Sequence, residues 1–282
     1  MKRDRWWLCI VPLYAFTLVF VLGPVLYMVA VSFARNTGGY GFQWSFTLDN
    51  FRKMRDPVYL QCFQQSLLLA LSTTVLNVLI GYPFGYFMAR RSPRGKRLLL
   101  FLIMIPFWTS SLIRLYGWLI LLQARGVLNR FLMWLGMIDT PLKILYTYPA
   151  VLIGMVYGLF PFMVLAVYTS VEKMDWTLVE AARDLGASPL RAFLTVTLKL
   201  TLPGLMSGVI LTFVPSMGLF FIADILGGNK IVLVGSLIQD QMTRGSNQPF
   251  AAALALILSV MTTLLLWLYR KVTGTSDLEG MF

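Results

Sequence analysis

The sequence predicts an all-α integral membrane protein, built as a single transmembrane domain over residues 1–282 with six transmembrane helices and both termini in the cytoplasm. Of its residues 58% are hydrophobic and only 13% are charged, which leaves too little polar surface to cover a soluble globule. Six apolar runs are each long enough to cross a hydrocarbon core about 30 Å thick. The runs are residues 8–33, 62–88, 98–122, 148–169, 202–226 and 250–269.

The first apolar run has two interpretations, a cleaved signal peptide or a retained membrane anchor. It follows the cations Lys2, Arg3 and Arg5, and residues 30–32 make a poor cleavage site. The run is also much longer than the apolar part of a signal peptide, which has about 7–15 residues. We therefore expect the first run to be retained as a span.

The orientation of the spans follows from the lysines and arginines of the loops. The segments 1–7, 90–97, 170–199 and 270–282 hold 14 of these cations in 58 residues, whereas the other loops hold 9 in 76. Cytoplasmic loops carry the excess of positive charge in membrane proteins. Both termini and the polar loop 170–199 are therefore expected in the cytoplasm, and the net charge of +12 requires no nucleic-acid partner.

Glycines and prolines within the spans predict how the helices pack and bend. Three pairs with Gly-x-x-x-Gly spacing would let helix backbones approach closely, because glycine has no side chain. The pairs are Gly81/Gly85, Gly154/Gly158 and Gly204/Gly208. Four prolines each leave a backbone carbonyl without its helical partner and so favour a kink. They are Pro83, Pro106, Pro161 and Pro215.

One outer loop contains a short amphipathic piece at residues 129–138, whose apolar residues include Phe131 and Trp134. It could lie along the outer face of the membrane, as amphipathic helices do, or pack on the helix bundle. The sequence leaves both interpretations open.

The polar loop 170–199 contains signals for two short helices. Thr177 and Glu180 have the spacing of a capping box, in which each side chain bonds the backbone amide of the other, and they predict a helix over residues 178–185. Gly186 suits the left-handed residue that follows the end of a helix. The first helix is therefore expected to end in a sharp turn.

Ser188 and Pro189 suit the cap and the first position of a second helix. Two helices joined by a sharp turn would form a rigid projection at residues 178–191, which we call the foot. Composition alone would also suit an ordinary solvated loop. The capping signals favour the foot, because a loop that only connects two spans has no need of two capped helices.

The foot resembles the EAA loop of bacterial ABC importer permeases. That loop has Glu-Ala-Ala, three residues, Gly, nine residues and an aliphatic residue, matched here by Glu180, Ala181, Ala182, Gly186 and Val196. The resemblance implies the type I permease architecture and a coupling helix that docks in a groove of a separate ATPase subunit. The ATPase-coupling residues that it implies are Glu180, Ala181, Ala182, Asp184 and Gly186.

This chain departs from the family pattern at the start of the fifth span. The family has Leu-Pro after the aliphatic residue, whereas this chain has Leu198 and Lys199 there and places Leu202 and Pro203 four residues later. The departure can move the start of the fifth helix by about one turn. It leaves the implied docking role of the foot unchanged.

A further resemblance, to the permeases of spermidine and putrescine importers, runs through most of the chain. It is carried by residues 46–50, 106–114, 135–141 and 217–220. It implies import of polyamines into the cytoplasm across the bacterial inner membrane. It also implies the partners, which are two copies of an ATPase, a second and different permease subunit, and a periplasmic polyamine-binding protein.

Asp224 is the one carboxylate within an apolar run, and it has two interpretations. It could be a solvated side chain or a structural partner of Arg114, or it could attract an ammonium group, since carboxylates in membranes are costly and usually paired with a cation. At about 1.5 Å per residue from Pro203 it lies about 30 Å along the fifth run, near the outer boundary. The polyamine resemblance favours the second interpretation, and the positive charge of Arg114 opposes it.

Aromatic side chains within the spans could hold the ammonium and methylene groups of a polyamine, although most membrane aromatics serve interfaces or packing. Trp108 and Tyr157 rank first, because each lies well inside a span and beside a proline or glycine. Tyr116, Trp118 and Phe220 are further candidates, and Phe160 and Phe221 join Trp108 and Tyr157 in the predicted set. With Asp224 they make up the predicted substrate pathway.

The sequence has no feature that points to catalysis or to a cofactor. It has no histidine, and its two cysteines cannot build a metal cage. It has no Gly-x-x-x-x-Gly-Lys-Ser/Thr loop, so ATP and Mg²⁺ are expected on the partner ATPase. We therefore expect a non-catalytic membrane subunit with no metal and no cofactor of its own.

Two alternative functions stay open. A permease of the same kind for another small organic solute fits every observation above. An ion-coupled secondary carrier that works alone is less favoured, because such carriers usually have paired repeats and titratable groups near the middle of the membrane. Neither feature is seen in this sequence.

Overall fold

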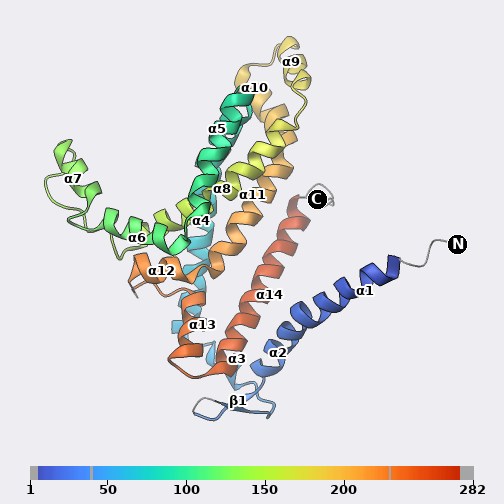
Figure 1. The fold of residues 1–282 in the computed structure, drawn as a ribbon, viewed down its shortest axis with the longest axis vertical. Coiled ribbons are helices and arrows are strands. Elements are labelled where there is room, and N and C mark those ends of the chain that lie inside the picture. Colours follow the sequence, from blue (N-terminus) through green and yellow to red (C-terminus); the bar gives the residue numbers. More distant parts are fainter. Residues whose placement is uncertain (1–5, 39–40, 229, 274–282) are drawn as a thin grey trace. The chain divides into compact units, whose positions relative to one another are not determined.

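The chain folds into helices with one short β-hairpin (Figure 1). The computed structural model describes residues 6–38, 41–228 and 230–273. Contacts divide the chain into two compact units: unit 1 is residues 1–63 and 234–265, and unit 2 is residues 64–233 and 266–282. The helix α4 (Pro57–Ala89) begins in unit 1 and ends in unit 2.

Unit 1 packs the start of α4 against helix α14 (Gln248–Thr273). Phe250 and Leu254 of α14 are buried together with Met54, and the Tyr59 ring meets the Phe250 ring edge-on at 5.0 Å. The other elements of unit 1 are α1 (Trp6–Thr17), the π-helical turn η1 (Leu18–Leu22), α2 (Gly23–Ser32), the antiparallel strands β1 (Arg35–Asn36) and β2 (Phe42–Gln43), α3 (Asp49–Lys53) and α13 (Val234–Thr243).

Unit 2 is built around α8 (Tyr148–Glu172), which packs along α11 (Leu198–Gly218) and against α12 (Phe220–Gly227). Met155, Met163 and Val167 of α8 are completely buried. The remaining elements of unit 2 are α5 (Pro93–Met104), the 3₁₀ turn η2 (Ile105–Trp108), α6 (Ser111–Leu122), α7 (Val127–Trp134), α9 (Thr177–Asp184), α10 (Pro189–Ala192) and the π-helical turn η3 (Phe193–Thr197).

The predicted glycine pairs lie where α8 meets its neighbours. A Cβ on Gly81 of α4 would lie 2.7 Å from the Met163 side chain, and a Cβ on Gly208 of α11 would lie 2.6 Å from the same side chain. A Cβ on Gly154 of α8 would lie 2.5 Å from Leu226 of α12. These three contacts are with side chains. A backbone lies close at Gly85, whose Cβ would lie 3.0 Å from the Val164 carbonyl oxygen, and at Gly204, whose Cβ would lie 2.9 Å from the Ala166 carbonyl oxygen. The close approach of backbones is therefore found at the first and third glycine pairs, whereas Gly158 has only an ordinary contact of 3.7 Å.

Within the described ranges, five helices are long and apolar enough to cross a membrane. They are Val11–Ser32, Pro57–Ala89, Tyr148–Glu172, Pro189–Gly218 and Gln248–Tyr269. A sixth span is obtained when the bent pair Pro93–Trp108 and Ser111–Trp134 is counted as one. The structure thus agrees with the all-helical membrane fold and with six crossings. The third and fifth predicted spans, however, are each interrupted.

The third predicted span, residues 98–122, is not one straight helix. Its two parts meet at an angle of 94°. Pro106 lies in the 3₁₀ turn just before the break, where its missing N–H removes a helical hydrogen bond, and Thr109 then adopts an extended conformation with φ −97° and ψ 149°. The kink predicted at Pro106 is therefore a full break.

The fifth predicted span, residues 202–226, is two helices. Helix α11 ends at Gly218, and Leu219 leaves the helical region with φ −76° and ψ 67° before α12 begins. Pro215 weakens the last turn of α11, because it has no N–H to donate. The span also begins earlier than predicted, since helical structure runs without a break from Pro189 through η3 into α11.

The amphipathic piece of the outer loop forms α7, and its apolar side chains are exposed. Phe131 is 53% exposed and Trp134 is 79% exposed, as a helix lying in a membrane interface requires. The buried Asn129 amide donates hydrogen bonds of 2.9–3.2 Å to three loop carbonyls and accepts one from the Leu142 amide. These bonds fix α7 to its own loop, while Leu128 on the other side of α7 packs against the core around α8 and α12. The helix therefore has both an exposed apolar side and a contact with the bundle.

Candidate functional site

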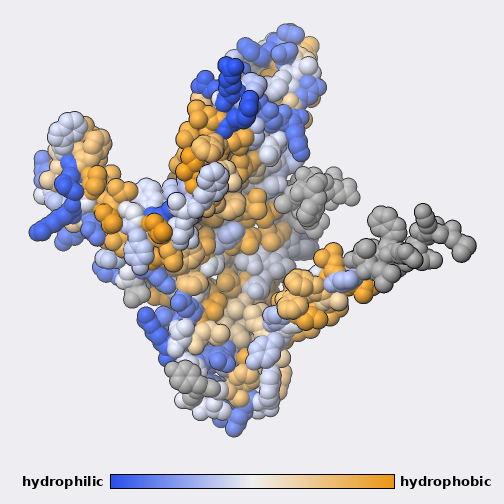
Figure 2. All heavy atoms as spheres, in the orientation of Figure 1, coloured by the Kyte–Doolittle hydropathy of each residue, from blue (hydrophilic) through white to orange (hydrophobic). Residues whose placement is uncertain are grey.

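The two loops predicted to face the cytoplasm meet at one end of unit 2. Lys96 at the start of α5 donates from Nζ to both carboxylate oxygens of Glu172 at the end of α8, at 2.8 and 2.6 Å. Hydrophilic residues gather at this end, which carries α9 and α10, and hydrophobic side chains cover the helices below it (Figure 2). The structure therefore places loops 90–97 and 170–199 on the same side, as the charge pattern predicts.

The first helix of the foot, α9, begins one residue earlier than predicted and without a capping box. Thr177 is the first residue of the helix and not its cap. The Asp175 carboxylate accepts hydrogen bonds from the Thr177 amide at 3.0 Å and from its hydroxyl at 2.8 Å. The Glu180 amide bonds the Trp176 carbonyl at 3.2 Å. The capping-box prediction was wrong because an acceptor two residues upstream engages Thr177 first.

The turn between the two helices of the foot has the predicted form. Gly186 has a φ of +88°, and its amide donates to the Arg183 carbonyl at 2.9 Å. The Ala187 amide donates to the Ala182 carbonyl at 3.1 Å, which completes a Schellman motif. The Ser188 hydroxyl then caps α10 by accepting from the Arg191 amide at 3.3 Å. These bonds make the foot a rigid piece.

The surface of the foot is unusually apolar for a segment in water. No residue of α9 is buried, and Leu178 is 47% exposed. Leu185 is 90% exposed and Leu190 is 68% exposed, the first beside the turn and the second on α10. Glu180 and Asp184 are also exposed and lie on the same helix. The foot therefore presents apolar and acidic side chains together, outside the packed core.

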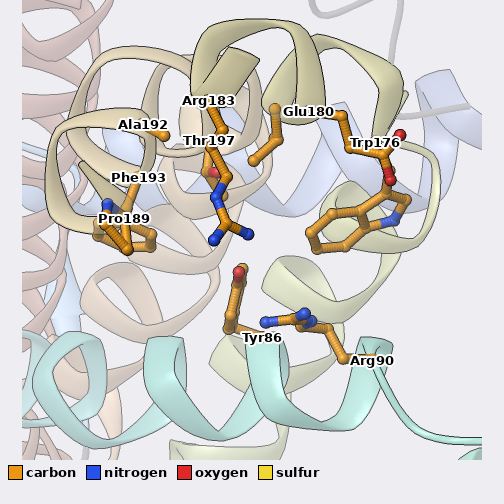
Figure 3. A pocket seen from close by; sticks show the side chains of 10 residues that line it. Tyr86, Arg90, Trp176, Glu180, Arg183, Pro189, Ala192, Phe193 and Thr197 are labelled. Atoms are coloured by element: carbon orange, nitrogen blue, oxygen red, sulfur yellow. The ribbon is translucent and has the colours of Figure 1, made fainter. Parts of the chain in front are cut away.

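A pocket of about 170 Å³ lies beneath the foot, between α9 and the end of α4 (Figure 3). The guanidinium carbon of Arg90 lies 5.4 Å from the centre of the Trp176 ring and 5.8 Å from that of the Tyr86 ring, both within cation–π range. The Arg183 side chain reaches into the same pocket from α9 (Figure 3). The other lining residues are Val179, Glu180, Pro189, Ala192, Phe193 and Thr197.

Sequence reasoning missed the residues of this pocket outside the foot. Two of them, Tyr86 of α4 and Arg90 just after it, are four residues apart and so point to the same side, which is a signal that the sequence does contain. Their partners Trp176 and Phe193 are distant in the sequence. Without the fold, nothing indicates that this face meets the foot.

Asp224 lies on α12 and not at the end of a continuous fifth helix. Its neighbours Ile222, Ala223 and Leu226 are buried in the core around α8, and Asp224 itself is half-buried. It lies in the last turn of α12, which ends at Gly227. In the described part of the chain Arg114 is in no ion pair, and its guanidinium lies over the rings of Phe107 at 5.2 Å and Tyr157 at 6.0 Å.

The four candidate aromatics do not form one cluster. Tyr157 meets the Trp118 ring at 5.4 Å, and Trp118 and Phe221 both pack against the core that holds α12. Phe160 instead packs edge-on against Phe84 of α4 at 5.7 Å, within a different core. Trp108 lies at the break in the third span and is 75% exposed. Phe221 thus lies on α12, and Tyr157 lies beside the same core through Trp118. Phe160 and Trp108 lie outside that core.

The fold and the foot define the class of the protein, a multi-pass membrane component of a transport system. The chain belongs to the family described as binding-protein-dependent transport system inner membrane components, which matches residues 81–273. It is therefore a non-catalytic subunit of an ABC importer in the inner membrane. Members of this family use no cofactor of their own, and they work with an ATPase and a binding protein.

Two relatives named spermidine/putrescine transport system permease protein PotB are similar over nearly their whole length. The PotB of Escherichia coli (strain K12) is 44% identical over 264 residues, covering 94% of this chain and 96% of that protein. The PotB of Haemophilus influenzae is 41% identical over 259 residues, covering 92% and 91%. The resemblance to polyamine permeases is confirmed by these values.

Two solved structures share the fold at low sequence identity. A bacterial alginate ABC transporter, in complex with an alginate pentasaccharide-bound periplasmic protein, has a TM-score of 0.75 at 16% identity, covering 96% of this chain and 95% of the matched chain. The MetNI methionine ABC transporter in an inward-facing conformation has a TM-score of 0.60 at 17% identity, covering 79% and 100%. The ABC importer permease fold is therefore confirmed.

Proposed function

We propose that this chain is the permease subunit that carries spermidine and putrescine into the cytoplasm in an ABC importer. The observation that carries the proposal is the 44% identity to E. coli PotB across 94% of this chain. The partners that we assign to this subunit are two copies of the ATPase, a second and different permease subunit, and a periplasmic polyamine-binding protein. The name of the relatives, spermidine/putrescine transport system permease protein, supports the polyamine cargo.

The foot is the surface that we assign to the ATPase. Leu185 and Leu190 are mostly exposed, although burying a leucine contributes about 1.5–3 kcal/mol. A groove that covers these leucines would gain that free energy, and the Schellman turn holds both helices in one orientation. The coupling residues of the proposal are Glu180, Ala181, Ala182, Asp184 and Gly186.

The proposed substrate pathway passes Asp224, because a half-buried carboxylate among the buried apolar residues of α12 attracts an ammonium group. Tyr157 offers an aromatic face beside Trp118, although the guanidinium of Arg114 lies 6.0 Å from the same ring and competes with an ammonium group for it. Phe221 packs beside the core that holds α12. Trp108 and Phe160 stay in the proposal with weaker support. Trp108 is exposed and so is open to a solute, and Phe160 lies inside the span formed by α8.

Reconstitution of the full complex in liposomes tests the function. We expect uptake of labelled spermidine and putrescine that requires ATP inside and the binding protein outside. Uptake of another solute in place of polyamines would overturn the cargo and keep the importer. Uptake by the purified chain alone, driven by an ion gradient, would overturn the importer and favour a secondary carrier. A binding-protein titration against several polyamines would rank the substrates.

A further inference from the structure

A continuous series of side-chain contacts connects the foot to the inner ends of α4 and α11. It begins at Trp176, the residue just before α9, whose ring meets the Tyr86 ring of α4 at 6.0 Å. Arg90, the residue just after α4, lies over both rings, at 5.4 Å from Trp176 and 5.8 Å from Tyr86. The guanidinium therefore joins the entrance of the foot to the last turn of α4 (Figure 3).

The series continues from α4 into α11. The Tyr86 ring meets the Phe193 ring edge-on at 5.9 Å, and the same Phe193 ring meets the Tyr82 ring at 5.9 Å. The Tyr82 hydroxyl lies 2.8 Å from the Thr201 hydroxyl. Because Thr201 donates its own hydrogen to the Thr197 carbonyl at 2.8 Å, Tyr82 is the donor of this bond.

The last contacts of the series fall on an irregular turn of the helix. Phe193 is the first residue and Thr197 the last of η3, where the Leu198 amide bonds the Phe193 carbonyl five residues back. Such π-helical turns are rare and are often found at functional positions. The rings of Tyr82 and Tyr86 thus support the one place where the helix from the foot into α11 departs from regular geometry.

We propose that Arg90 and Trp176 are positioning residues that clamp the entrance of the foot to the end of α4, so that a displacement of the foot moves α4 together with α11. The proposal rests on the docking of the foot on the ATPase proposed above. The chain itself connects the foot only to α8 and α11, which are its neighbours in the sequence. The clamp adds α4, whose contact with the foot is made by side chains alone.

The chemistry of the clamp suits a contact that opens and closes. Arg90 is exposed, and its guanidinium carbon lies within cation–π range of two rings, with no ion pair to a described residue to hold it there. The same pocket is also lined by Arg183, whose positive charge opposes that of Arg90, and by Glu180, whose negative charge offsets part of that repulsion (Figure 3). Exposed contacts of this kind can position the foot and still open and re-form as the foot moves.

The test measures how many ATP molecules the complete importer hydrolyses for each polyamine that it transports. Arg90→Gln and Trp176→Leu are expected to raise this ratio about five-fold, with the ATPase still bound, because the foot moves without moving α4. Arg90→Lys keeps the cation and is expected to restore most of the coupling. Arg91→Gln is the matched control, because Arg91 lies 4.0 Å over the Phe87 ring, a contact that does not involve the foot.

Tyr82→Phe provides a second variant that keeps the ring and removes one hydroxyl. It is expected to raise the ratio in the same direction as Arg90→Gln, since it separates α4 from Thr201. A ratio equal to that of the unsubstituted importer in Arg90→Gln and Trp176→Leu overturns the clamp. An equal rise in Arg91→Gln also overturns it, by showing a general effect of lost charge.

Failure of the underlying function has a different signature. If the foot does not dock on the ATPase, the ATPase still copurifies with the Leu185→Asp complex. That result rejects both the docking and the clamp that rests on it. If the foot docks and the clamp does not exist, Leu185→Asp releases the ATPase while Arg90→Gln transports with an unchanged ratio. The two results are separated by one measurement of copurified ATPase.

Discussion

The substitution Gly186→Val would test the coupling role of the foot most directly. A Cβ built on Gly186 meets no atom within 4 Å, so valine would cause no clash at this position. Its cost would come from holding a residue with a branched side chain at a φ of +88°, where an L-residue is strained by about 1–2 kcal/mol. A cost of that size changes the balance between the ordered and the opened turn by about 5- to 30-fold.

We expect the Gly186→Val importer to assemble and to hydrolyse ATP, because the Ser188 cap and the rest of the foot are untouched. The number of ATP molecules hydrolysed per spermidine taken up should rise about five-fold or more, since the turn no longer holds the two helices together. The assay measures phosphate release and labelled uptake in the same liposomes.

Two matched variants control this experiment. Gly186→Asn is expected to stay close to the unsubstituted protein, because asparagine tolerates the left-handed conformation. Gly117→Val places the same side chain in equally open surroundings on α6, at a residue with no positive φ. An unchanged ratio in Gly186→Val, or an equal rise in either control, would refute the coupling role of the turn.

Three further predictions concern the pathway and the packing. Asp224→Asn should raise the KM for spermidine uptake about tenfold, because the ammonium group loses its charged partner; an unchanged KM removes Asp224 from the pathway. Gly204→Leu should lower stability in detergent by about 1–3 kcal/mol or more, because its Cβ would overlap Ser170; an unchanged melting temperature contradicts the packing. Reversing the charge of Lys96 or of Glu172 should destabilise the protein, and reversing both should recover about 1 kcal/mol of coupling in a double-mutant cycle; no recovery means that the pair contributes nothing.

The turn of the foot could be predicted from the sequence because its signals are local. Gly186, Ser188 and Pro189 each have a conformational preference that holds whatever surrounds them, and the structure shows all three in the expected role. The start of the foot was predicted wrongly for an equally local reason. Asp175 and Glu180 both compete for Thr177, and spacing alone does not tell which carboxylate wins.

Breaks and contacts within the bundle could be predicted only in part. Pro106 and Pro215 indicate where helical bonds are missing, but whether a helix bends or stops depends on the neighbours that hold it. The contact of Arg90 with Trp176 joins residues far apart in the sequence, and no pattern within either segment indicates the other. The substrate candidates show the same limit, since Tyr157 and Phe160 are near in sequence but pack in different cores.

The glycine contacts of α8 have a consequence for the route of a solute. At Gly208 the backbone of α11 lies so close to α8 that a single added carbon would lie 2.6 Å from Met163. A polyamine chain, several ångströms wide, has no room to pass between these two helices without prising them apart. The helices α8 and α11 therefore form a closed contact within unit 2, and we expect the route of a solute to lie away from the gap between these two helices.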